Sequence, residues 1–236
     1  MSKLYLIRHG SANSKGENYD MLSERGIQQS KFLSSYFESI HLNPSVVYSG
    51  SLKRQKDTAE ISTSFLQQDV ERKEFIGLNE ITVELWRTVA ESLSLTDASF
   101  ADTLQTWLQV RSEGGKRVLL LFYNLTVKIV KAWKEKQVEL GGLYSYEEFK
   151  SSCLSFLEEL NHYSGKEDVV IAFSSGTPIS ILLSKFLQLG EERDLDWLPR
   201  IYNTSLSVID YRDGKFTPYC INSISHIRTD NLINLI

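Results

Sequence analysis

Cysteine is scarce in this sequence, and its scarcity excludes two classes of protein. The only cysteines among the 236 residues are Cys153 and Cys220, which lie far apart and have no CxxC partner. A disulfide framework or a zinc site needs clustered cysteines, so neither is expected, and the composition fits a reducing cytoplasm. The four histidines are scattered and no HExxH motif is present, so we expect no metal and no cofactor.

Long apolar runs and a large excess of one charge are also missing. The most apolar stretch, residues 118–127, has about half the length of a membrane span, and the run over 4–7 is too short for a signal-peptide core. The 26 Lys and Arg against 30 Asp and Glu give a formal net charge of −4, which provides no basic field for nucleic acid. We therefore expect a cytoplasmic globular protein without membrane or nucleic-acid partners.

Apolar residues follow strand and helix patterns in alternation. Short continuous apolar runs are typical of buried strands, and helical spacing characterises the segments between them. The expected strands are 4–7, 46–48 and 169–173, and the expected helices run from the Ser23 cap to about 40, from 52 to 68, and from 178 to 187. A hairpin is expected at 206–211 and 216–221. This order predicts an α/β fold with a mostly parallel central sheet.

A helical insert interrupts the alternation from about residue 85 to residue 163. Strand signals fade there, and three helical patterns appear instead, at 98–110, 118–137 and 146–160. Glycine pairs at 114–115 and 141–142 mark turns, without the composition of a flexible linker. We therefore predict one domain over residues 1–236 with a cap-like helical insert.

The residues that follow the strands are the first candidates for chemistry, because ligands of open α/β sheets bind at the carboxyl ends of the strands. Arg8 and His9 follow the first predicted strand, and the segment from Ser49 to Arg54 follows the second. Arg54 would lie at the start of a helix, where the helix dipole repels a cation. Each feature alone also fits a structural role, as an Arg-His pair or a surface arginine.

Taken in order, these segments resemble the histidine phosphatase superfamily, which includes the phosphoglycerate mutases. The run from Leu4 to Gly10 resembles the family's RHG signature, and residues 77–80 resemble the segment that carries its acid. Further matches are Leu22, Ser23, Gly26 and Gln29 in the first helix, Ser49, Leu52, Arg54, Thr58 and Ala59 in the second motif, and 222–227 with His226 as the last strand. The resemblance implies a three-layer α/β/α sandwich in which the helical insert forms a lid.

The resemblance also implies phosphomonoester hydrolysis through a phosphohistidine. An imidazole nitrogen of His9 would attack phosphorus, and water would discharge the intermediate. Arg8 and Arg54 would bind the phosphate oxygens, because planar guanidinium groups match phosphate geometry. Glu80 would protonate the leaving oxygen if burial raises the pKa of its carboxyl, whereas a solvated Glu80 would have no such role. The implied ligand is a phosphorylated small molecule or inorganic phosphate.

One position departs from the family pattern. The family's second histidine lies in a Ser-His-Gly sequence after a buried strand, whereas Ser175 stands there in this chain. Loss of one donor to the phosphoryl group lowers turnover by about 10²- to 10³-fold without abolishing it. Ser175 and Gly176 remain candidate phosphate-binding residues. The serine hydroxyl donates one hydrogen bond, and a helix capped by Thr177 with Pro178 at its first position would aim N–H groups at the phosphate.

Two interpretations therefore stay open. Retention of Arg8, His9, Arg54 and Glu80 favours an altered or weakened phosphatase, and Ser175 favours a pseudoenzyme that binds a phosphorylated ligand or a partner protein without turnover. A serine-hydrolase elbow does not fit, because the sequence around Ser175 lacks the leading glycine of Gly-x-Ser-x-Gly. The residues after His9 differ from the Gly-Glu-Thr/Ser of the mutase branch, which favours hydrolysis over phosphoryl transfer.

The insert and nearby cations would decide which substrate is accepted. Arg87 and Lys15 are the cationic residues that we expect to reach a second anionic group of a substrate. Aromatic residues of the insert, such as Trp86 and Trp133, are more often core than ligand contacts.

Overall fold

The computed structural model describes residues 1–13, 20–66, 70–113, 115–165 and 167–235. These residues form two compact units. Unit 1 consists of the described residues of 1–13, 20–80 and 152–235, and unit 2 is Ile81–Ser151. The boundary at Ser151 falls within one helix, so residues 152–163 of the predicted insert belong to unit 1.

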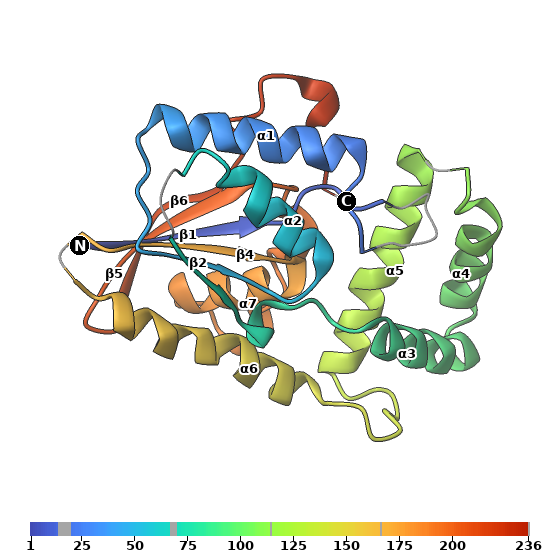
Figure 1. Ribbon diagram of the computed structural model, residues 1–236. Coiled ribbons are helices and arrows are strands. Elements are labelled where there is room, and N and C mark those ends of the chain that lie inside the picture. Colours follow the sequence, from blue (N-terminus) through green and yellow to red (C-terminus); the bar gives the residue numbers. More distant parts are fainter. Residues whose placement is uncertain (14–19, 67–69, 114, 166, 236) are drawn as a thin grey trace. The chain divides into compact units, whose positions relative to one another are not determined.

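Unit 1 is built on a six-stranded sheet (Figure 1). Its strands are β1 (Ser2–Arg8), β2 (Val46–Ser49), β3 (Glu71–Glu74), β4 (Val169–Ser174), β5 (Leu206–Arg212) and β6 (Lys215–Ser223), in the order β3-β2-β4-β1-β5-β6. The first four strands of this order are parallel, and the sequence predicted three of them, β2, β4 and β1. Strand β5 is antiparallel to both of its neighbours, β1 and β6, and it forms the predicted hairpin with β6 through Asp213 and Gly214, both with positive φ.

Helices cover both faces of the sheet. On one face, Leu4, Leu6 and other strand residues pack against α7 (Gly176–Phe186) and the end of α6 (Tyr146–Glu159). On the other, Ile7 and its neighbours pack against residues of α1 (Glu24–Ser39) and α2 (Lys53–Ser62). Figure 1 shows these two helices on the same face of the sheet. Successive strand residues point to opposite faces, so a strand buried on both sides is apolar throughout. These layers confirm the predicted α/β class.

Two segments of unit 1 differ from the prediction. The helix expected over 52–68 ends at Ser62, where Thr63 caps it, and residues 67–69 lie outside the described part of the chain. Strand β3 was not predicted, because its sequence is Glu-Arg-Lys-Glu and has no apolar residue. As an edge strand, β3 is held by backbone pairing with β2.

Unit 2 is helical. It contains α3 (Val83–Thr96), α4 (Ala98–Val110), α5 (Lys116–Lys134) and the first turns of α6. The sequence pattern predicted the last three and missed α3, whose cap at Thr82 accepts a hydrogen bond from Leu85 N. Trp133 is almost fully buried, in agreement with a core role, and Trp86 packs against Trp107 and Phe122.

Short 3-10 helices complete the described residues, at Ile76–Leu78, Leu160–Tyr163, Glu191–Arg193, Leu198–Arg200 and Asp230–Leu232. The last strand, expected to extend to residue 227, ends at Ser223, so His226 lies beyond it. None of the helices in the described ranges is long and apolar enough to cross a membrane.

Candidate active site

The carboxyl ends of β1, β2 and β4 bring the predicted site residues to one edge of the sheet. Arg8 pairs in register with Ser174, and Ser49 pairs with Phe173. His9 N then donates to Ser174 O at 2.9 Å. The segments that follow the three strands are therefore neighbours in space, as expected for a ligand site in a parallel sheet.

His9 is the central residue of this edge and is 5% exposed. Its Nδ1 lies 2.7 Å from Gly10 O, and Arg54 Nε donates to its Nε2 at 3.2 Å. A carbonyl only accepts and a guanidinium only donates, so the proton is on Nδ1 and the lone pair is on Nε2. Burial, with the positive charges of Arg54 and Arg8, holds the pKa of His9 well below its ordinary value of 6.5.

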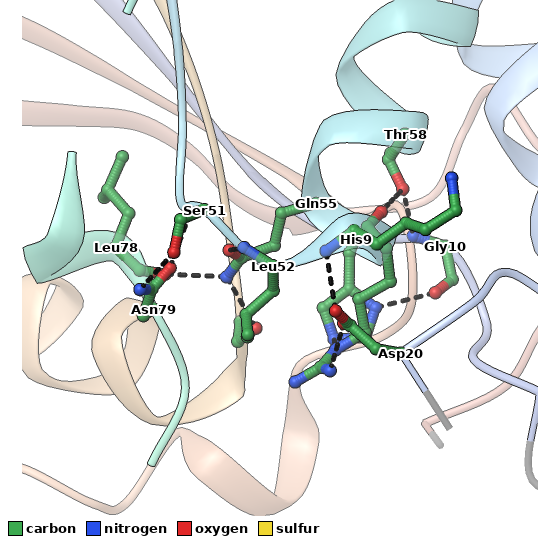
Figure 2. Close-up of polar contacts among 12 residues, drawn as sticks. His9, Gly10, Asp20, Ser51, Leu52, Gln55, Thr58, Leu78 and Asn79 are labelled. Carbon is green, nitrogen blue, oxygen red and sulfur yellow. Dashed lines mark hydrogen bonds and ion pairs between the residues drawn. The ribbon is translucent and has the colours of Figure 1, made fainter. Parts of the chain in front are cut away.

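The loop around His9 is fixed by a hydrogen bond and by close packing. Gly10 N donates to Thr58 Oγ1 (Figure 2). A Cβ at Gly10 would lie 2.7 Å from Gly26 O. Only glycine fits this approach between the loop and α1. Asn203 Nδ2 donates to His9 O at 3.0 Å, which holds the loop from the β5 side.

The depressed pKa of His9 has a measurable consequence. We expect the imidazole resonances of His9, identified by their loss in His9→Ala, to stay unchanged between pH 8 and pH 6 in an NMR titration. The unfolded chain takes up a proton near pH 6.5 that folded His9 does not, so this residue lowers stability as the pH falls below 6.5. A titration of His9 centred at 6.5 would contradict a neutral imidazole at this position.

Arg54 is held beside His9 by an acidic residue that the sequence did not indicate. Its side chain is almost fully buried, and Nη1 pairs with Asp20 Oδ1 at 2.8 Å. Asp20 Oδ2 also accepts a hydrogen bond from Lys53 N in the first turn of α2 (Figure 2). Asp20 thus offsets the unfavourable position of a cation at a helix start.

Arg8 is fixed by backbone carbonyls. Its Nη1 donates to Ile201 O at 2.5 Å and to Leu235 O near the C-terminus. A Cβ at Gly176 would lie 4.0 Å from the guanidinium carbon of Arg8 and 3.8 Å from Glu80 Oε2. Arg8, Glu80 and the start of α7 are therefore neighbours. Carbonyls from distant segments leave no sequence motif, so these contacts could not have been predicted.

Glu80 is positioned by the segment that precedes it. Asn79 Oδ1 accepts a hydrogen bond from Ser51 N, and a Cβ at Gly77 would collide with Ser152 O at 2.1 Å. Glu80 Oε2 itself accepts a hydrogen bond from Thr177 N at 3.1 Å. The carboxylate is partly buried and reaches the start of α7. It is therefore not the solvated surface group that the sequence left open.

The start of α7 differs from the prediction. Ser175 is the cap residue, Gly176 begins the helix, and Pro178 is its third residue, whereas Thr177 and Pro178 were expected to be the cap and the first position. Proline fits there because the first turn has N–H groups without helical acceptors. Thr177 Oγ1 is buried and has no hydrogen-bond partner within the described residues.

The structure brings together six of the predicted residues: Arg8, His9, Arg54, Glu80, Ser175 and Gly176. Arg87 lies on α3 of unit 2 and Lys15 lies outside the described residues. Across the described ranges, no three His, Cys, Asp or Glu side chains are grouped so as to hold a metal ion. Asp20, Gln55 and Asn203 also contact the site, and no sequence pattern indicated them.

Fold and site together define an α/β protein with a buried histidine between two arginines at the edge of its sheet. The chain matches the model of the histidine phosphatase superfamily (branch 1) over residues 4–121 and 123–224. It therefore belongs to the histidine phosphatase superfamily.

Characterised and solved proteins resemble the chain over nearly its whole length. The 5''-phosphoribostamycin phosphatase of Niallia circulans is 26% identical over 239 residues, covering 96% of this chain and 99% of that protein. The α-ribazole phosphatase of Shigella flexneri has a TM-score of 0.65 at 19% identity and covers 94% of this chain and 96% of its own. A mycobacterial glucosyl-3-phosphoglycerate phosphatase, solved with VO3, has a TM-score of 0.58 at 20% identity, covering 94% and 98%. The two structural similarities show a shared fold.

Proposed function

We propose that the protein is a phosphomonoesterase that hydrolyses a phosphorylated small molecule through a phosphohistidine at His9. The observation that carries the proposal is the hydrogen bond from Arg54 Nε to His9 Nε2, which leaves that nitrogen unprotonated and beside a guanidinium. An unprotonated nitrogen is the nucleophile, and a guanidinium is the partner that phosphate oxygens prefer. The curated phosphatase that matches 96% of the chain supports this reading.

The proposed reaction has two steps, the formation of the phosphohistidine and its hydrolysis. His9 Nε2 attacks phosphorus, the bond from phosphorus to the ester oxygen breaks, and the Glu80 carboxyl delivers a proton to that oxygen. Water then attacks the phosphohistidine, Glu80 takes a proton from it, and the bond from phosphorus to nitrogen breaks to release phosphate. Arg54 transfers its hydrogen bond from His9 to the phosphate when substrate enters, and Arg8 neutralises further charge.

The alternative is a phosphate-binding protein of the same fold without turnover, and Ser175 is the observation that favours it. The two functions separate in one experiment. Purified protein and His9→Ala are compared for hydrolysis of p-nitrophenyl phosphate from pH 5 to 8. A rate that disappears with His9 supports the enzyme, and equal rates would leave only the binding function.

A phosphoryl-transfer rate between two alcohols well above the rate of hydrolysis would refute the hydrolase.

Both functions predict an anion site at Arg8 and Arg54. Vanadate or phosphate at ten times its dissociation constant should stabilise the fold by about 1.4 kcal/mol, which raises Tm by roughly 3–5 °C for a chain of this size. Differential scanning fluorimetry measures the shift, and Arg54→Met should abolish it. Absence of a shift at millimolar vanadate would count against both functions.

A further inference from the structure

Gln55 is a fully buried polar residue that directly follows Arg54 on α2. Its side chain does not reach solvent and makes hydrogen bonds to three residues. Nε2 lies 2.8 Å from Leu78 O and 2.8 Å from Ser175 Oγ, and Oε1 lies 3.3 Å from Leu52 N (Figure 2). The first turn of α2 thus aims Arg54 at His9 and Gln55 at Ser175.

These partners determine which end of the amide faces Ser175. Leu78 O only accepts hydrogen bonds and Leu52 N only donates them. The nitrogen of Gln55 therefore faces Leu78 and the oxygen faces Leu52, so the opposite amide orientation is excluded. Because Nε2 donates to Ser175 Oγ, the serine oxygen is an acceptor in this contact. The single proton of the Ser175 hydroxyl therefore points away from Gln55 and can be donated to another group.

The Ser175 side chain does not cap its helix, as a serine at this position normally does. Ser175 is the cap of α7, yet its side chain makes no capping hydrogen bond. Pro178, at the position that a cap serine normally binds, has no N–H, and Thr177 N donates to Glu80. Within the described part of the chain, no protein acceptor for the Ser175 proton is present.

The surroundings of Ser175 are those of the phosphate site. The preceding carbonyl, Ser174 O, accepts the His9 N–H, and the following residue, Gly176, lies next to Arg8 and Glu80. A buried hydroxyl proton without a protein acceptor, between these groups, suits an anionic oxygen of a ligand.

We propose that Gln55 is a positioning residue that fixes the Ser175 hydroxyl as a hydrogen-bond donor to the transferring phosphoryl group. This inference rests on the proposed function. Ser175 touches the phosphoryl oxygen, and Gln55 acts only through Ser175. The pair therefore supplies a directed donor at the place where the family carries a histidine.

A double-mutant cycle of Gln55→Met and Ser175→Ala tests the proposal through kcat and KM for p-nitrophenyl phosphate. Ser175→Ala should lower kcat about 10²-fold with little change in KM, because one transition-state donor is lost. Gln55→Met keeps the chain length and removes the amide, and it should lower kcat about 10-fold through the misdirected hydroxyl. In the Ser175→Ala background, Gln55→Met should change kcat less than about 2-fold.

Ser174→Ala is the matched control. Ser174 Oγ donates to Leu78 O at 2.8 Å, the same carbonyl that Gln55 binds, and it is equally buried. Ser174→Ala removes a bond to Leu78 and leaves Ser175 untouched, so it should lower Tm and leave kcat unchanged. Equal losses from Gln55→Met in both backgrounds, or the same kcat loss in Ser174→Ala, would show a merely structural Gln55 and overturn the proposal.

Two further experiments cover the cases in which Gln55→Met does not fold or the protein has no phosphatase activity. If Gln55→Met does not fold, Gln55→Glu is used, since its carboxylate accepts the Ser175 proton and should lower kcat at least as much. If the wild type hydrolyses no faster than His9→Ala, the proposed function fails, and the cycle is measured as vanadate affinity. Gln55→Met should then weaken vanadate binding only where Ser175 is present, and equal weakening in both backgrounds would refute the positioning role.

Discussion

Replacing His9 with alanine is expected to lower kcat for p-nitrophenyl phosphate by about 10⁴-fold or more, because the covalent route through phosphohistidine is lost. The effect should be larger than that of any other single substitution in the site. In the proposed mechanism Arg54, Arg8 and Glu80 still bind and polarise phosphate, but none of them replaces the nitrogen that forms the bond to phosphorus. Initial rates at saturating substrate give the result.

His162→Ala provides a matched control for this prediction. His162 is an exposed histidine in the 3-10 helix Leu160–Tyr163, which precedes the amino end of β4, whereas the site lies at the carboxyl end of that strand. Its removal should leave kcat unchanged. A His9→Ala protein that folds, binds vanadate and retains more than about a tenth of the wild-type kcat would exclude a His9 phosphohistidine.

Replacing Arg54 with methionine is expected to lower kcat/KM about 10³-fold, the range found when an arginine that stabilises phosphoryl transfer is lost. In the proposed mechanism Arg54 binds the phosphate oxygens next to His9; its Nε reaches His9, and Asp20 holds its Nη1. Arg54→Lys should recover only part of the loss, because an ammonium lacks the planar fork. Steady-state kinetics of both variants measure the effect.

Lys53→Met is the control for charge and helix position. Lys53 precedes Arg54 on α2, and its ammonium forms a partly exposed pair with Asp57 at 2.8 Å. Exposed pairs of this kind contribute little to stability. Lys53→Met should keep kcat/KM near the wild-type value. An equal loss in both variants would mean that net charge, and not the position of Arg54, drives phosphate binding.

The residues of the candidate site were predictable where they occupy a fixed place relative to a strong local pattern. His9 and Arg8 end an apolar strand, and Arg54 opens a helix after another strand. Glu80 carried a weaker signal, since only its resemblance to the family distinguished it from a surface carboxylate. Helix α7 begins two residues earlier than predicted. The prediction followed the local cap signal of Thr177-Pro178, whereas Thr177 N donates to Glu80, which is distant in the sequence.

The sequence by itself determined the α/β class, the parallel core strands, the hairpin and the place of His9 at the end of a buried strand, because apolar periodicity and motif spacing act over a few residues. Only the tertiary structure decided that Asp20 neutralises Arg54, that carbonyls of Ile201 and Leu235 hold Arg8, and that Gln55 binds Ser175. Ser175 and Gln55 are 120 positions apart. Such contacts join residues that share no local pattern. The hydrogen-bond partner of a buried amide is therefore known only from the folded structure.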